Sequence, residues 1–150
     1  MKKLHPAVFF PMALFACLLF VQRAEARDTL HNWDVQEALQ QGQQKGVILD
    51  NVKVYFAGQT HPEVEKKINE FRTNRKTNAF NKSDKEACLW TFFSAIKSLQ
   101  ERALREGGNA VIDIKSNYKN QEFVSATEFQ CGAGTFVAGV ALKGTVVTLK

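Results

Sequence analysis

The fold of this chain is decided by residues 83–108, SDKEACLWTFFSAIKSLQERALREGG, which NAVIDIK at residues 109–115 follows at once. Ser83 and Glu86 have the spacing of a capping box, in which each side chain accepts from a free backbone N–H at the start of a helix. Apolar residues then recur at helical spacing, at Leu89, Phe92, Phe93, Ile96, Leu99 and Ala103. Gly107 and Gly108 suit the left-handed backbone that ends a helix. The stretch therefore predicts one long helix with a wide buried stripe.

Alternating or continuous apolar patterns around this helix predict strands. The expected strands are residues 47–56, 70–77, 110–115, 123–131 and 135–149. Pro62 is expected to open a short helix with Val64, Ile68 and Phe71 on one side. The pattern predicts an α+β fold: a mostly antiparallel sheet of four to five strands with the long helix packed on one face.

Finer details follow from the last two strands. Gly132 and Gly134 are expected in a turn that joins them. Residues 135–149 contain only one charge, Lys143, so this strand is expected at the centre of the sheet, buried on both faces. Gly139 and Ala141 are expected to face the long helix and to let it approach closely. On the expected strand at residues 110–115, Ala110, Ile112 and Ile114 are predicted to share one face.

The first 26 residues read as a secretory signal. Lys2 and Lys3 precede an apolar run at residues 7–21, and Ala24 and Ala26 suit cleavage before Arg27. The run of about 15 residues is short for a membrane span, which needs roughly 20. An alternative is lipid attachment at Cys17, because LFAC at residues 14–17 loosely resembles a lipoprotein box. We expect ordinary cleavage, a periplasmic protein and no transmembrane helix after it.

Two further segments follow the signal. Residues 27–46 form a polar, glutamine-rich arm in which Asn32 is expected to cap a weak helix, and residues 47–150 form the α+β domain. The arm has a thin apolar face, so it either docks weakly on the domain or binds a partner. We favour docking.

The charge of the expected mature chain is mild. Removing Lys2, Lys3, Arg23 and Glu25 from the 20 basic and 15 acidic residues leaves 17 and 14, a net charge of +3. This value does not indicate a nucleic-acid-binding protein, and export argues in the same direction.

Cys88 and Cys131 are the two cysteines that remain after cleavage. In an exported protein such a pair predicts a disulfide, which would close a loop of about 43 residues and stabilise by roughly 4 kcal/mol. The alternative is a reactive Cys88 thiolate, because the start of a helix lowers a thiol pKa.

A basic segment around Arg72, Arg75 and Lys76 is the possible binding surface. Phe71 and Phe80 flank it, as in surfaces that contact phosphates and stack on rings. The simpler interpretation is a charged edge strand, whose lysines and arginines discourage pairing between sheets.

Patterns for catalysis or cofactor binding are missing from the sequence. His31 and His61 lie far apart in expected loops and show no metal-ligand spacing, and there is no GxSxG elbow or phosphate loop. We therefore expect no catalytic residue, no metal site and no cofactor.

A resemblance adds to this interpretation. Residues 87–111, with Cys88 and the run GNAV at 108–111, together with EFQC at 128–131 and GVALKG at 139–144, resemble the YbjQ-like and RcsF-like small bacterial envelope proteins, over roughly residues 47–149. Relatives of this kind often carry an excinuclease ATPase label, although the chain has no loop of the type that cradles phosphates. The resemblance implies an α/β domain, an envelope location and a disulfide like Cys88–Cys131, but no known activity.

Three functional hypotheses follow. We favour an exported, non-catalytic binding or assembly module of the envelope with an unknown partner protein. The second is an enzyme with an unrecognised site involving Asp113, His61 or a free Cys88. The third is weak binding of metal ions or polyanions.

Overall fold

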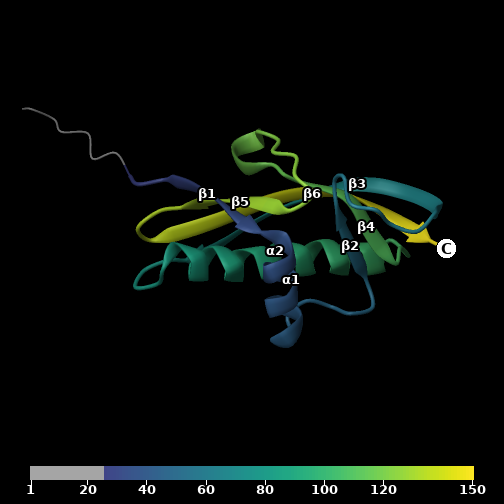
Figure 1. The fold of residues 1–150 in the computed structure, drawn as a ribbon, viewed down its shortest axis with the longest axis horizontal. Coiled ribbons are helices and arrows are strands. Elements are labelled where there is room, and N and C mark those ends of the chain that lie inside the picture. The colour runs from purple at the N-terminus through teal and green to yellow at the C-terminus, as the bar shows by residue number, and fades with distance from the viewer. Residues whose placement is uncertain (1–25) are drawn as a thin grey trace, which may run out of the picture.

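The computed structural model describes residues 26–150, which form a six-stranded sheet with two helices (Figure 1). The elements are β1 (Thr29–Asp34), α1 (Val35–Gln44), β2 (Lys53–Phe56), β3 (Val64–Asn78), α2 (Asp84–Arg105), β4 (Ala110–Ser116), the 3-10 helix η1 (Tyr118–Asn120), β5 (Glu128–Ala133) and β6 (Val137–Leu149). Both α-helices lie against one face, the helical face, and the segment with η1 rises from the other, the outer face. The predicted α+β class is confirmed. The proposed signal and Cys17 lie outside the described residues, apart from Ala26.

β6 is the centre of the sheet, as predicted. It pairs with β3 along its whole length, from Val137 to Leu149. Because a strand has only two edges, β5 and β4 share the other edge, β5 at Ala138 and Gly139 and β4 from Leu142 to Val147. β1 extends the sheet beyond β5, and β2 extends it beyond β4.

The sheet is mixed rather than purely antiparallel. β2 runs parallel to β4, whereas the other pairs are antiparallel. The predicted strand at 47–56 is shortened to Lys53–Phe56, because residues 47–52 form a loop held by the buried side chain of Gln100. That side chain bonds both the N–H and the C=O of Leu49.

The prediction of a short helix after Pro62 is wrong. Residues 64–78 form the single strand β3, which has no partner besides β6 in the described sheet. The spacing of Val64, Ile68 and Phe71 fits a helix, but the backbone groups along one edge of β6 need partners, and pairing with β3 supplies them. The charged edge strand that we expected at residues 70–77 is part of β3.

The long helix agrees with its prediction. Ser83 caps α2 by accepting from the Glu86 N–H at 3.1 Å, and Gly107 takes a positive φ of 77° after the last turn. The stripe is the core: Phe92, Phe93, Ile96 and Leu99 are each no more than 1% exposed. Phe92 stacks on Phe129 of β5 with ring centroids 4.1 Å apart.

Three details of the strands differ from the predictions. Asp113 has a φ of 53° at an irregularity in the β4–β6 pairing, so Val111 and Ile114 both enter the core under α2, while Ile112 packs on the outer face. The predicted strand at 123–131 begins only at Glu128, because residues 117–127 leave the sheet apart from a single bridge between Phe123 and Ser116. β5 then continues through Gly132 to Ala133, and the turn before β6 lies at residues 134–136.

Gly139 and Ala141 of β6 face away from the long helix, opposite to our expectation. Ala138, Val140 and Leu142 belong to the core under α2. Gly139 alternates with them, and a Cβ atom added to it would meet Tyr118 and Lys76 on the outer face. The β6 side chains that pack under α2 are therefore Ala138, Val140 and Leu142, and the space that the missing side chain of Gly139 leaves lies on the outer face.

The N-terminal arm is docked more firmly than its composition suggests. β1 pairs with β5 over six residues, and Val35 and Ala38 of α1 are fully buried in the core. The cap of α1 is Asp34, which accepts from the Glu37 N–H at 2.7 Å. The expected cap, Asn32, lies within β1.

The predicted disulfide is present. Cys88 in the second turn of α2 is bonded to Cys131 of β5, with their Cα atoms 5.8 Å apart. Both residues are fully buried. The bond attaches the N-terminal half of α2 to β5.

Candidate binding site

The three basic residues singled out in the sequence lie on β3, but on both of its faces. Arg72 is paired with Lys143 and Lys76 with Gly139, which places both on the outer face. Arg75 is paired with Val140, and its guanidinium donates to Ser98 Oγ of α2 at 2.7 Å. The structure therefore separates Arg75 from the other two.

Several basic side chains of the outer face have an acidic partner. Arg72 lies 3.9 Å from Glu70, Lys115 lies 3.2 Å from Asp113, and Lys143 bonds Glu122. Hydrogen bonding to Lys143 also lowers the pKa of the Glu122 carboxyl. Lys76 has no acidic partner within 4 Å among residues 26–150. The outer face thus offers one uncompensated cation beside Gly139.

A flat glycine surface lies next to Lys76. Gly132 of β5 and Gly139 of β6 are paired across the two strands. A Cβ atom on Gly132 would lie 2.1 Å from Cζ of Tyr118, whereas a Cβ atom on Gly139 would lie 3.5 Å from that ring. The phenol ring therefore rests on the backbone of Gly132, whereas a methyl group at Gly139 would meet the ring only at ordinary contact distance.

Tyr118 is fixed by Asp28, which precedes β1. Its hydroxyl donates to Asp28 Oδ1 at 2.8 Å, and Lys119 bonds the other carboxylate oxygen. Burial, together with the bond to Asp28, raises the pKa of Tyr118 to about 12. Hydrogen bonds from Lys119 and Tyr118 lower the pKa of Asp28. Neither group exchanges a proton near neutral pH, so this pair suits a fixed wall rather than acid–base chemistry.

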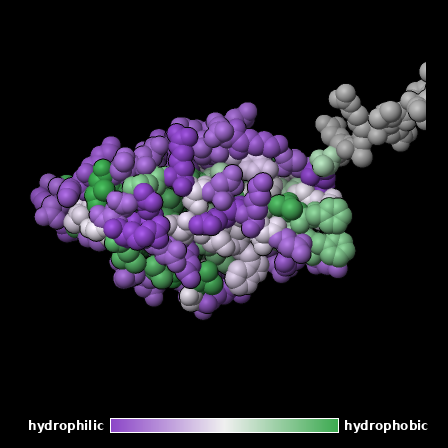
Figure 2. Space-filling model, turned by 180° about the vertical axis from the view of Figure 1, so that it is seen from behind, coloured by the Kyte–Doolittle hydropathy of each residue, from purple (hydrophilic) through white to green (hydrophobic). Residues whose placement is uncertain are grey.

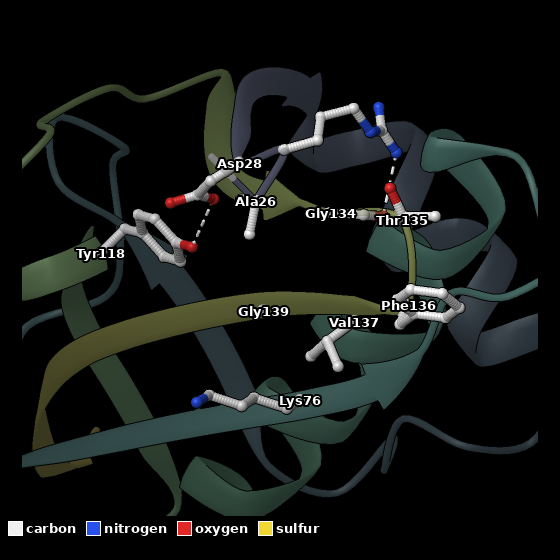
Figure 3. Close-up of a pocket in the computed structure, with 11 residues that line it drawn as sticks. Ala26, Asp28, Lys76, Tyr118, Gly134, Thr135, Phe136, Val137 and Gly139 are labelled. Atoms are coloured by element: carbon white, nitrogen blue, oxygen red, sulfur yellow. Dashed lines mark hydrogen bonds between the residues drawn. The ribbon is translucent and has the colours of Figure 1, made fainter. Parts of the chain in front are cut away.

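These residues surround a hollow of about 360 Å³ on the outer face (Figure 3). Tyr118 and Asp28 stand on one side of it and Lys76 on the opposite side, while Phe136 and Val137 close one end. Gly132 and Gly139 contribute backbone to its lining. Within the described part of the chain, the hollow combines apolar walls, a glycine floor that the Tyr118 ring covers in part, and one cation without an acidic partner, Lys76.

Two aromatic side chains extend the apolar surface beside the hollow. Phe80 and Phe136 are 53% and 63% exposed and stack with ring centroids 5.8 Å apart. The Ala79 N–H donates to the Phe136 carbonyl at 2.8 Å and holds the two loops together. Val137 is a further 49% exposed. In Figure 2, hydrophobic residues gather at the end of the molecule where the grey segment begins.

An ion cluster holds the start of the described chain at this end. Arg27 donates to both carboxylate oxygens of Asp84 at 2.8 Å and to the Gly134 carbonyl at 2.9 Å. His31 Nε2 lies 2.9 Å from the same carboxylate. The hydrogen bond from Arg27 is the main cause that lowers the pKa of Asp84 to about 2.

His31 was expected in a loop but lies in β1. Sequence reasoning missed the whole cluster, because 57 residues separate Arg27 from Asp84 and no local motif marks such a contact.

The groups named for an enzymatic site are not brought together. The sulfur of Cys88 is in the disulfide, Asp113 pairs with Lys115, and the Nδ1 of His61 contacts its neighbour's carbonyl, that of Pro62. Within residues 26–150 these three side chains make no hydrogen bond or ion pair with one another. The same part of the chain contains no group of three or more His, Cys, Asp or Glu residues placed to hold a metal ion.

Comparison of the chain with protein-family models, with curated proteins and with solved structures gives no significant match. In the described part of the chain, no helix has the length and apolar character needed to cross a membrane.

Proposed function

We propose that the chain is an exported, non-catalytic binding or assembly module of the bacterial envelope. It would contact a partner through the end of the sheet that carries the hollow and the Phe80–Phe136 stack. The observation that supports this most directly is the stack itself. Two exposed aromatic rings beside a hollow are typical of an interaction site, because contiguous exposed apolar surface is uncommon where nothing binds.

The disulfide supports the proposed compartment. A buried Cys88–Cys131 bond is compatible with a protein that folds in an oxidising environment such as the periplasm. The likeness to the YbjQ-like and RcsF-like proteins remains a proposal, which rests on the sequence runs quoted above and on the position of this disulfide.

Photo-crosslinking in intact cells tests the binding role. We would place p-benzoylphenylalanine at Phe136 and, as a matched control, at Val124, which is 58% exposed but does not line the hollow. A specific crosslinked partner at position 136 and none at position 124 is expected. Equal labelling at both positions, or none at either, would contradict the proposal.

The proposed export and cleavage before Arg27 can be tested separately. Mass spectrometry of protein recovered from the periplasmic fraction should show Arg27 as the first residue, without lipid. Recovery of the uncleaved chain from the cytoplasm, or of a lipidated Cys17 at the N-terminus, would contradict the proposed processing.

A further inference from the structure

We propose that the hollow binds an amphipathic monoanion, namely a flat apolar ring that carries a single carboxylate close to it. This inference rests on the proposed binding function and names the chemistry that the site would recognise. It follows from three properties of the site: its charge, its floor and its walls.

The charge of the site determines how many anionic groups the ligand carries. Among residues 26–150, Asp28 is the one acidic residue that lines the hollow, and its two oxygens are occupied by Tyr118 and Lys119. The guanidinium of Arg27 is occupied by Asp84 and the Gly134 carbonyl. Lys76 is the lining cation with no acidic partner among residues 26–150. One carboxylate on the ligand would therefore balance the charge of Lys76. The further charges of a polyanion would have no unpaired cation to bind among the described lining residues, because Arg27 is already paired.

The floor determines the shape of the apolar part. Gly132 and Gly139 place backbone rather than side chains beneath the hollow, and the ring of Tyr118 already covers Gly132. Over Gly139 a narrow space remains between Tyr118 Cε2 and the Cγ of Lys76, which lie 3.5 and 3.7 Å from a Cβ atom built there. A planar ring would enter this space edge-on, between the Tyr118 ring and the Lys76 side chain, and would gain contact on both of its faces.

The walls add further contact for the ring. Val137 and Phe136 are about half exposed or more, so a ring on the glycine floor would cover apolar surface that now faces water. The carboxylate of such a ligand would lie on the β3 side, beside the Lys76 ammonium. Two sources share this chemistry: a free aromatic acid, and a peptide whose last residue is aromatic.

The test is an NMR titration of the disulfide-bonded chain from Arg27 to Lys150 with two probes. N-acetylphenylalanine has the ring and the carboxylate, and N-acetylphenylalaninamide has the same ring without the charge. We expect the acid to shift the backbone signals of Gly132, Gly139 and Phe136 and to bind about fivefold more tightly than the amide, as expected for a partly exposed ion pair. Equal affinity, or shifts confined to other residues, would overturn the proposal.

Two variants separate the roles of charge and floor. Lys76→Gln should remove the preference for the acid, whereas Lys66→Gln, an exposed lysine on the same strand, should keep it. Gly139→Ala adds a methyl group at ordinary contact distance, so the protein should stay folded and lose affinity for both probes. Unchanged affinity in Gly139→Ala, or an unchanged preference in Lys76→Gln, would contradict the proposed pose.

A tetrapeptide that ends in phenylalanine distinguishes the two sources. Tighter binding than N-acetylphenylalanine would assign a peptide C-terminus, and equal binding a free aromatic acid; both results support the monoanion site. Crosslinking at Phe136 does not depend on Lys76. A partner found there, with no preference for the acid in the titration, would overturn the ligand class and leave the binding function standing.

Discussion

Gly132 and Gly139 face each other across β5 and β6, yet only Gly132 lies directly beneath the ring of Tyr118. A pair of glycines weakens a sheet, because neither contributes side-chain packing. An aromatic ring laid across glycine from outside restores part of that packing. The two glycines are therefore not equivalent, and their substitution should have different consequences.

Gly132→Ala should displace Tyr118, because the added methyl group would overlap the phenol ring. We expect the free energy of unfolding to fall by about 1–3 kcal/mol, the usual cost of overpacking. Urea unfolding of this variant and of Gly139→Ala provides the measurement and its control. The prediction fails if the two variants are equally stable.

Removal of the disulfide should destabilise the protein without exposing a reactive thiol. The Cys88→Ala/Cys131→Ala double variant should lose about 2–4 kcal/mol of unfolding free energy. Peptide mapping of the native chain after alkylation without reductant should give one linked peptide that contains both cysteines. Two alkylated thiols in protein from the periplasm would argue against a structural bond.

Substitution of the α2 stripe should test the core. Phe92 is fully buried, so Phe92→Ala should cost about 3–5 kcal/mol. Leu104 of the same helix is 46% exposed, and Leu104→Ala should change stability by no more than about 0.5 kcal/mol. Thermal or urea unfolding measures both, and similar values would show that the stripe is misassigned.

The ion cluster at Asp84 predicts a pH dependence. The folded-state pKa of Asp84 is lowered from 3.8 to about 2, so its stabilising effect is present above the unfolded value and is lost as the pH falls through the folded one. Asp84→Asn should therefore be less stable than the natural chain at neutral pH, with the difference shrinking between about pH 4 and pH 2. The free energy of unfolding of both proteins, measured between pH 7 and about pH 2, tests this prediction. Glu65→Gln, which removes an exposed acid without an ion pair among the described residues, should show no comparable pH-dependent difference.

The parts of the fold that were predictable are those that local patterns encode. The α2 stripe, its Ser83 cap and the central position of β6 follow from residues close together in sequence. The apolar spacing predicts a helix for part of β3, because only the pairing of β3 with a distant strand makes it extended. The orientation of Gly139 depended on an alternation that sequence alone could not place on either face.

The candidate site was predicted only in fragments. Arg72, Arg75 and Lys76 were recognised as a basic segment, but a strand directs alternate side chains to opposite faces. The hollow also needs Asp28, Tyr118 and the two glycines, which come from distant parts of the chain. No spacing rule connects them, because the site forms only when β1, β5 and β6 lie side by side.

The short seam between β5 and β6 has a consequence for local opening of the native protein. Only two register pairs join these strands, whereas thirteen join β3 to β6. The β1–β5 ribbon is thus a candidate for a separately opening unit in hydrogen exchange, and the disulfide to α2 is the covalent restraint that holds it closed. The hollow spans this seam, with Gly132 on one side and Gly139 on the other. Oxidation of Cys88 and Cys131 would therefore act as a maturation step, after which the two sides of the hollow stay together.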